Sequence, residues 1–125
     1  MPDESNPDAE KLLYSIAEAG AVVPPLFKIE VGQGLLMGVR RKRVTESFPQ
    51  EAIALLNALP LELDADGAGR TWTTCIQLAA AHGLTLYDAT YLELAIRGGR
   101  PLATLDARLA LAARQAGAAL ALPLQ

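Results

Sequence analysis

The sequence is poor in residues on which several classes of protein depend. A single cysteine, Cys75, excludes an internal disulfide, and a single histidine, His82, excludes a histidine-based metal cluster. Aromatic residues are 5% of the chain, which is few for a base-stacking surface. The apolar runs are shorter than the roughly 20 residues of a membrane helix, and no secretory leader precedes them. We therefore expect a soluble, cytoplasmic protein without a membrane span.

Positive charge is also scarce. The net charge of −3 argues against binding nucleic acid through bulk charge, although the run at residues 40–43 is densely basic. That run is interpreted either as a solvated helix end, where cations complement the helix dipole, or as a patch that contacts RNA. With 125 residues, 51% of them hydrophobic, the chain suffices for one core, so we expect a single domain over residues 1–125.

Helical periodicity alternates with short apolar runs along the chain. The pattern predicts helices at about residues 7–19, 25–40, 48–59, 71–81, 85–97 and 106–115. The third of them follows a capping box of Ser47 and Gln50, and its predicted core face is Ile53, Leu56 and Leu59. It predicts short strands at residues 21–23, 61–63, 101–104 and 118–122. This alternation is typical of an α/β domain with a mostly parallel sheet.

The second of these helices carries an acid beside apolar residues. Helical spacing predicts that Glu30 shares a stripe with Leu26, Ile29, Gln33 and Met37. Glycines interrupt the helix and indicate the close approach of another backbone; they are Gly32, Gly34 and Gly38. Close packing and a ligand-driven role are both compatible with this pattern.

Two aspartates, Asp88 and Asp106, stand at the starts of predicted helices. Thr85 and Asp88 match a capping box, and Asp106 is placed to cap the helix that follows it. Each cap stabilises a helix by about 1 kcal/mol without any chemistry. Local pattern alone therefore explains both aspartates.

Their placement also predicts a metal site. Asp106 follows the strand 101–104, and ligands of open α/β sheets bind beyond the carboxyl ends of the strands. Asp88 shares a stripe with Tyr91, Leu92 and Ala95, so it is expected to face packed surface. Carboxylates that converge there repel one another unless a divalent cation neutralises them, and oxygen ligands favour Mg²⁺ or Mn²⁺. Such a cation activates water and stabilises charge on a phosphodiester.

Two segments carry a resemblance to a known family. Residues 87–118, YDATYLELAIRGGRPLATLDARLALAARQAGA, resemble the C-terminal half of PIN-domain ribonucleases, specifically the VapC-type toxins of toxin–antitoxin systems. Residues 20–36, GAVVPPLFKIEVGQGLL, resemble the family's second acidic motif, in which a strand leads into a helix with a glutamate. The motifs are specific as a set, and the resemblance covers nearly the whole chain.

The resemblance implies a function and its residues. Glu30, Asp88 and Asp106 match metal-binding and catalytic acids of the family, and Thr104 matches a position that often has a hydroxyl near the site. It implies a Mg²⁺- or Mn²⁺-dependent endoribonuclease that acts on RNA, forms a homodimer and is held inactive by a cognate antitoxin. The implied fold is a PIN-like three-layer α/β/α arrangement around a central parallel sheet.

The sequence departs from the family in two places. The family's first strand, which lies in the middle of the sheet and ends in a fourth acid, has no counterpart in the chain, whose start at residues 1–4 looks like a later turn. In addition, Gly32-Gln33-Gly34 replaces the usual small-Asn-small sequence. The first departure predicts an N-terminally truncated domain with two half-sheets, weak metal binding and doubtful activity, unless the true start lies upstream.

A second hypothesis follows from the same departure. A PIN-like module that lacks an acid and a strand could be catalytically silent and bind an antitoxin or another subunit. A phosphoacceptor receiver domain also has aspartates at strand ends, but it needs a lysine late in the sheet, and the lysines here are all in the first half of the chain.

Overall fold

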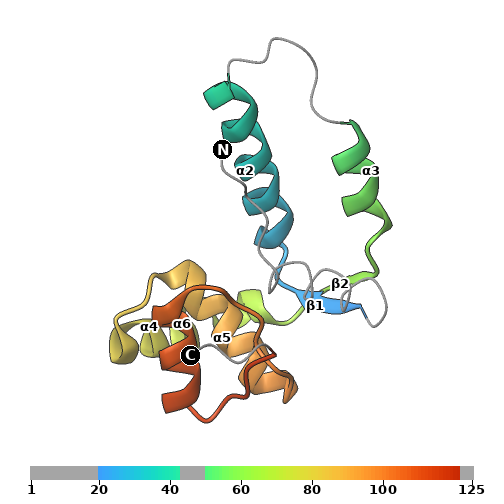
Figure 1. Cartoon of the computed structure of the whole chain (residues 1–125). Coiled ribbons are helices and arrows are strands. Elements are labelled where there is room, and N and C mark those ends of the chain that lie inside the picture. Colours follow the sequence, from blue (N-terminus) through green and yellow to red (C-terminus); the bar gives the residue numbers. More distant parts are fainter. Residues whose placement is uncertain (1–19, 43–49, 122–125) are drawn as a thin grey trace.

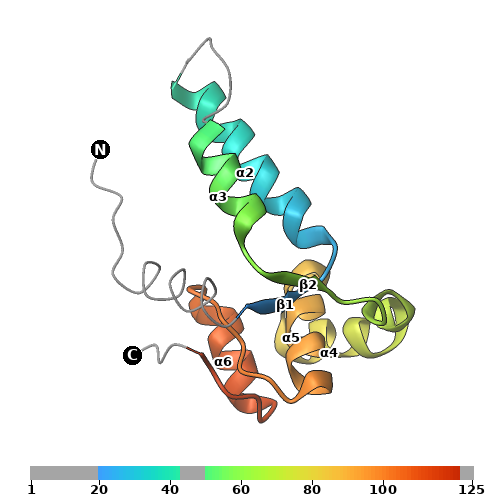
Figure 2. The same cartoon turned by 90° about the vertical axis from the view of Figure 1, so that its right-hand side faces the viewer.

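The computed structural model describes residues 20–42 and 50–121. The first half of this region contains a strand, two helices and a second strand: β1 (Ala21–Val23), α2 (Leu26–Lys42), α3 (Gln50–Ala58) and β2 (Leu61–Leu63). Helices α2 and α3 lie side by side and project from the two strands as an arm (Figures 1 and 2). Pro24 and Pro25 separate β1 from α2, as expected for prolines at a helix start.

The second half forms a helical body below the arm (Figure 1). A 3₁₀ turn (Gly67–Arg70) and a π turn (Thr71–Cys75) lead into α4 (Ile76–His82), which is followed by α5 (Leu86–Gly98) and α6 (Ala107–Gln115). Its core is built from small and branched apolar side chains of these helices, with Leu92 and Ala113 completely buried. The predicted helix 71–81 is thus present, but its first part is a π turn.

Helix α5 has the ends that its sequence predicts. The hydroxyl of Thr85 accepts a hydrogen bond from the backbone N–H of Asp88 at 3.1 Å, which confirms the first half of the capping box. At the other end Gly99 has a φ of 63°, a left-handed conformation that glycine adopts without steric cost. These two residues set the length of the helix that carries Asp88.

The strands pair in parallel but not in one sheet. β1 and β2 form a two-stranded parallel sheet in which Val22 lies opposite Glu62. The predicted strands 101–104 and 118–122 are wrong in extent, because the structure reduces them to one parallel bridge between Leu102 and Leu120. Pro101 has no N–H to donate, and so short a pair is marginal without further neighbouring strands. The described fold is a mixed α/β one with mostly helices.

A cavity of about 440 Å³ lies between the two parallel pairs. Val22 and Phe27 line it from the arm side, while Leu94 and Leu102 line it from the body side. In the described part of the chain the two pairs therefore meet across a largely apolar hollow and share no strand.

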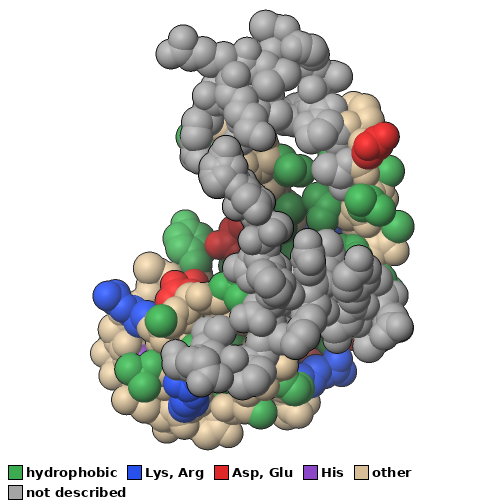
Figure 3. Space-filling view, viewed as in Figure 1, with side chains coloured by type: hydrophobic (Ala, Val, Ile, Leu, Met, Phe, Trp, Pro, Cys, Tyr) green, Lys and Arg blue, Asp and Glu red, His purple; other side chains and the backbone are tan. Residues whose placement is uncertain are grey.

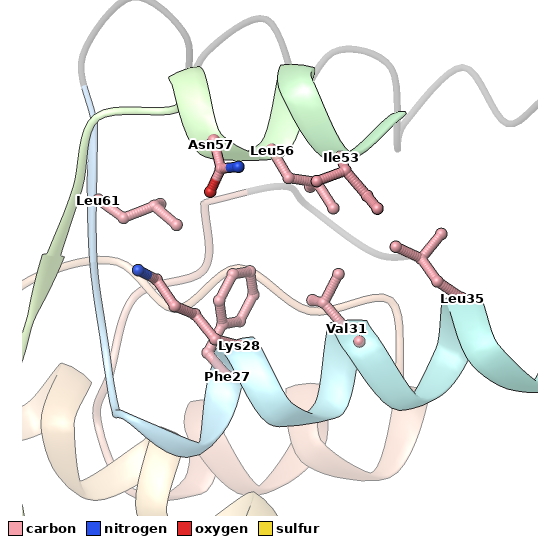
Figure 4. A pocket seen from close by; sticks show the side chains of 9 residues that line it. Phe27, Lys28, Val31, Leu35, Ile53, Leu56, Asn57 and Leu61 are labelled. Atoms are coloured by element: carbon pink, nitrogen blue, oxygen red, sulfur yellow. The ribbon is translucent and has the colours of Figure 1, made fainter. Parts of the chain in front are cut away.

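The predicted stripe on α2 does not lie against the body. Ile29 is 74% exposed and Met37 is 40% exposed. The more buried side of the helix carries Phe27, Val31 and Leu35, because α3 is the helix that packs beside it (Figure 4). The close-approach interpretation of the glycines is wrong for Gly32 and Gly34, since no described residue beyond the helix's own backbone places an atom within 4 Å of where their Cβ atoms would stand.

Three predictions lie outside the described residues. They are the helix at 7–19, the capping box that begins at Ser47, and the side chains of the basic run at 40–43. Within the described ranges, no helix combines the length and apolarity that crossing a membrane requires.

Candidate functional site

Asp88 is a partly buried carboxyl in the first turn of α5. Desolvation raises its pKa above the ordinary value, and the negative charges of Asp106 and Glu30 raise it further. A side-chain hydrogen bond with Thr85 acts in the opposite direction and is the smallest of these effects. The ionised form of Asp88 is therefore disfavoured in this environment, as it is wherever carboxylates share a site without a cation.

Asp106 is the N-cap of α6, as the capping interpretation predicts. Its Oδ1 atom accepts hydrogen bonds from the backbone N–H groups of Arg108 at 2.8 Å and Leu109 at 3.2 Å. Thr104 holds the turn before it, since its hydroxyl accepts a hydrogen bond from the Asp106 N–H at 3.0 Å. Both capping bonds reach the same carboxyl oxygen, so capping and a second role of Asp106 are compatible.

Glu30 lies on the exposed face of α2 and is tied to α5. The hydroxyl of Tyr91 donates a short hydrogen bond to Glu30 Oε1, across 61 residues of sequence. Desolvation and this bond to Glu30 raise the pKa of Tyr91 above its ordinary value, so the hydroxyl remains a donor at neutral pH. Sequence reasoning placed Tyr91 beside Asp88 but did not foresee its contact with Glu30.

The structure thus brings the three predicted acids into one electrostatic group. Acidic side chains gather where the arm meets the body (Figure 3), and the charges of Glu30 and Asp106 both act on Asp88. The group is not a closed metal cage, however: within residues 20–42 and 50–121, no three His, Cys, Asp or Glu side chains are arranged to hold an ion. The three side chains share only their chemistry with a metal site, since carboxylate oxygens are the ligand type that hard divalent cations prefer.

A second acidic cluster lies on the other side of α5 and contains its own cation. Arg97 donates two hydrogen bonds to Asp64, at 2.8 and 3.0 Å, and two to Glu93, at 2.8 and 2.9 Å. Glu93 is 3% exposed and lies 3.7 Å from Arg70 as well. The hydrogen bonds with Arg97 lower the pKa of Asp64, and those with Glu93 and Asp64 raise that of Arg97.

Sequence reasoning missed this second cluster, although part of its signal was present. Glu93 and Arg97 stand four residues apart on one helix, which is the spacing of a helical ion pair. Asp64 begins a short stretch of small and acidic residues that predicts only a turn, and nothing local indicates that its partner is 33 residues away. The cluster fastens the turn after β2 to α5.

The single cysteine and the single histidine both have positions that structure alone explains. Cys75 is completely buried, and desolvation raises the pKa of its thiol, so it is not an activated nucleophile. His82 ends α4, and its Nδ1 atom lies 3.3 Å from Gln115 Oε1. His82 thus lies at a helix end, the position that the glycine after it in the sequence predicts.

The arm carries an apolar groove of about 310 Å³ between α2 and α3 (Figure 4). Phe27, Val31 and Leu35 line one wall, and Ile53 and Leu56 line the other, which confirms the predicted core face of α3 for these two residues. Leu55, on the outer side of α3, is 70% exposed. The arm therefore offers apolar surface both inside and outside the groove.

Fold and site together define a mixed α/β protein with a loose group of three carboxylates supplied by three helices. A curated protein, ribonuclease VapC3 of Pyrobaculum aerophilum, is 29% identical to this chain over 110 residues, which cover 88% of the chain and 82% of that protein. No family model matches the sequence. The chain is thus similar to a VapC ribonuclease over most of its length, which supports the VapC-type resemblance of its motifs.

Proposed function

We propose that the protein is a divalent-cation-dependent endoribonuclease of the VapC toxin type. The observation that carries the proposal is that Glu30, Asp88 and Asp106 come from three helices into one electrostatic group, in which desolvation and the charges of the other two acids disfavour the ionised form of Asp88. The similarity to ribonuclease VapC3 supports RNA as the substrate. The proposed location of this activity is the cytoplasm.

The proposed cofactor is Mg²⁺ or Mn²⁺, held by oxygens of Glu30, Asp88 and Asp106. The chemistry that such a cation supplies is activation of water and neutralisation of charge on the scissile phosphodiester. Glu30, Asp88 and Asp106 would hold the cation through their carboxylate oxygens, although in the described residues they are not arranged as a preformed metal cluster. Thr104 supports the site by holding the turn that presents Asp106.

Each acid has a distinct task in this proposal. Asp106 uses Oδ1 to cap α6, which fixes the carboxyl group relative to the helix start. Asp88 is the acid whose ionised form is disfavoured by desolvation and by its acidic neighbours, so a bound cation would stabilise that form. Glu30 contributes from the arm, so the site depends on how the arm is held against the body.

The finer fold assignment is also a proposal: a single PIN-like, three-layer α/β/α domain whose central strand is missing from residues 1–125. The cavity of about 440 Å³ between β1 and the Leu102–Leu120 bridge supports it, because a strand placed there would pair with both. An experimental structure of this chain in which a strand already joins the two pairs would contradict the missing strand.

A cognate antitoxin and pairing of two copies complete the proposal. The groove between α2 and α3, together with the exposed Ile29 and Leu55, is apolar surface of the kind that protein partners cover. Light scattering of the purified chain, alone and after co-expression with a candidate antitoxin, measures both associations.

The decisive experiment is RNA cleavage by the purified chain with Mg²⁺, with Mn²⁺ and with a chelator. We expect cleavage only with a cation, and a loss of at least about 100-fold in Asp88→Asn, because removal of one ligand costs several kcal/mol of transition-state stabilisation. Asp66→Asn is the matched control, since Asp66 is exposed and its side chain forms no helix cap.

Two results would contradict this function. Cleavage that continues in the chelator, or that Asp88→Asn retains, would exclude the proposed site. No cleavage of any RNA tested, together with no heat of Mn²⁺ binding by titration calorimetry, would favour the catalytically silent module instead.

A further inference from the structure

Tyr91 links the two parts of the molecule that carry the proposed site. Its hydroxyl donates to Glu30 Oε1, and among the described residues this is the only side-chain hydrogen bond between α2 and α5. Asp88 lies three residues earlier on α5, one helical turn from Tyr91. The bond therefore sets the distance between an acid of the arm and an acid of the body.

The surroundings of this hydrogen bond allow Tyr91 to hold the Glu30 side chain in one orientation. Tyr91 is partly buried and lines the cavity between the two strand pairs, so its ring is held by packing while the hydroxyl reaches the arm. Glu30, by contrast, is exposed on a helix that projects from the body. A free glutamate side chain there would sample several rotamers, and each would place its carboxyl group differently.

The bond occupies one carboxyl oxygen and leaves the other. Only Oε1 of Glu30 receives the Tyr91 hydroxyl, so Oε2 remains for a cation. Carboxylates that bind metals are commonly hydrogen-bonded in this way, and the loss of such a partner costs about 10- to 100-fold in metal affinity or activity. A tyrosine also keeps its proton at neutral pH, so it adds no charge to an acidic group.

We propose that Tyr91 is the positioning residue of the site: through its hydrogen bond to Oε1 it orients the Glu30 carboxyl group, which together with Asp88 would hold a divalent cation. The proposal rests on the function proposed above and adds a residue to it. Tyr91 does not touch the cation or the substrate in this role.

The test is a double-mutant cycle on Mn²⁺ affinity, measured by electron paramagnetic resonance or calorimetry. Tyr91→Phe keeps the ring and removes the hydroxyl, and is expected to weaken Mn²⁺ binding about tenfold. Glu30→Asp keeps the charge but shortens the side chain, so the bond to Tyr91 is lost. If Tyr91 acts through Glu30, the double variant binds Mn²⁺ no more weakly than Glu30→Asp alone.

Tyr87→Phe is the matched control. Tyr87 lies on the same helix and is 65% exposed, so its variant should bind Mn²⁺ as the wild type does. Near-ultraviolet circular dichroism reports whether Tyr91→Phe retains the fold, and Glu30→Asp tests the same bond from the exposed side.

The outcomes separate the two proposals. Wild-type Mn²⁺ affinity in Tyr91→Phe, alongside lost binding in Asp88→Asn, overturns the positioning role and leaves the function standing. Additive losses in the double variant also overturn it, because they mean that Tyr91 does not act through Glu30. A wild-type chain that binds no Mn²⁺ overturns both proposals.

Discussion

Helix α5 carries two acidic clusters on opposite sides, and they differ in one component. On one side Asp64 and Glu93 surround Arg97, which forms four hydrogen bonds with them. On the other side the charges of Asp106 and Glu30 act on Asp88, and no arginine or lysine of the described residues is among the groups that shift its pKa. The residue types are the same, so the difference lies in the presence of a built-in cation.

The pKa values of the two aspartates are shifted in opposite directions by this difference. Hydrogen bonds with Arg97 lower the pKa of Asp64, whereas desolvation and neighbouring acids raise that of Asp88. A carboxylate with its own guanidinium is a structural element that needs nothing further. A carboxylate held among other acids lacks such a partner, so a cation from solution would stabilise its ionised form. This dependence on an external cation distinguishes a binding site from a salt bridge.

The strongest way to break the comparison is to remove the built-in cation. Arg97→Met leaves Glu93, which is 3% exposed, and Asp64 without their main partner. Removing one member of a buried ion pair costs about 3 kcal/mol or more, because the remaining charges stay desolvated. Urea denaturation should therefore show a large loss of stability at neutral pH.

Arg100→Met is the control for that change. Arg100 is exposed and lies two residues beyond the end of α5, so its variant should remain within about 0.5 kcal/mol of the wild type. Equal stability of the two variants would mean that the Arg97 cluster is not structural.

A second prediction compares the clusters through pH, with a chelator present. The folded-state pKa of Asp64 is below the ordinary 3.8, so its contribution to stability is present above that pH and is lost as the pH falls through the folded value. Asp64→Asn should thus destabilise the protein at pH 7 and have little effect in strong acid.

Asp88 should behave in the opposite way. Its folded-state pKa is above 3.8, so its favourable contribution is present below that pH and is lost as the pH rises through the folded value. Asp88→Asn should consequently raise the melting temperature at pH 7, and the gain should vanish in acid. Thermal unfolding from strong acid to pH 7 measures both variants, and effects of the same sign at pH 7 would show that the two clusters are not different in kind.

The sequence predicted those parts of the clusters that depend on local motifs, and missed the contacts between residues far apart in the chain. Glu30, Asp88 and Asp106 were found because motif resemblance marks each one separately, and helix periodicity placed Asp88 and Tyr91 together. The Asp64–Arg97 and Tyr91–Glu30 bonds join residues 33 and 61 positions apart. No local pattern encodes such distances, because they follow from how the turn after β2 and the arm pack on α5.

The same reasoning explains the errors in the fold. Strands 21–23 and 61–63 were predicted correctly because each is a short apolar or alternating run next to a turn residue. Strands 101–104 and 118–122 have equally good local patterns, but a strand extends only where a neighbour continues to pair with it. The exposure of Ile29 on α2 has a similar cause, since periodicity gives the stripe but not the side on which a partner helix lies.

The smallest expected effect separates the two roles of Asp106. Asp106→Ala removes the cap of α6 and should cost about 1 kcal/mol, whereas Asp106→Asn keeps it, since asparagine caps helices as well as aspartate does. Both variants remove the charge that acts on Asp88, so both should lose Mn²⁺ affinity, and only the alanine variant should lose stability. Calorimetric titration and thermal unfolding of the pair measure these two effects. If Asp106→Asn binds Mn²⁺ as the wild type does, Asp106 is a helix cap alone, and the cluster without a built-in cation reduces to Asp88 and Glu30.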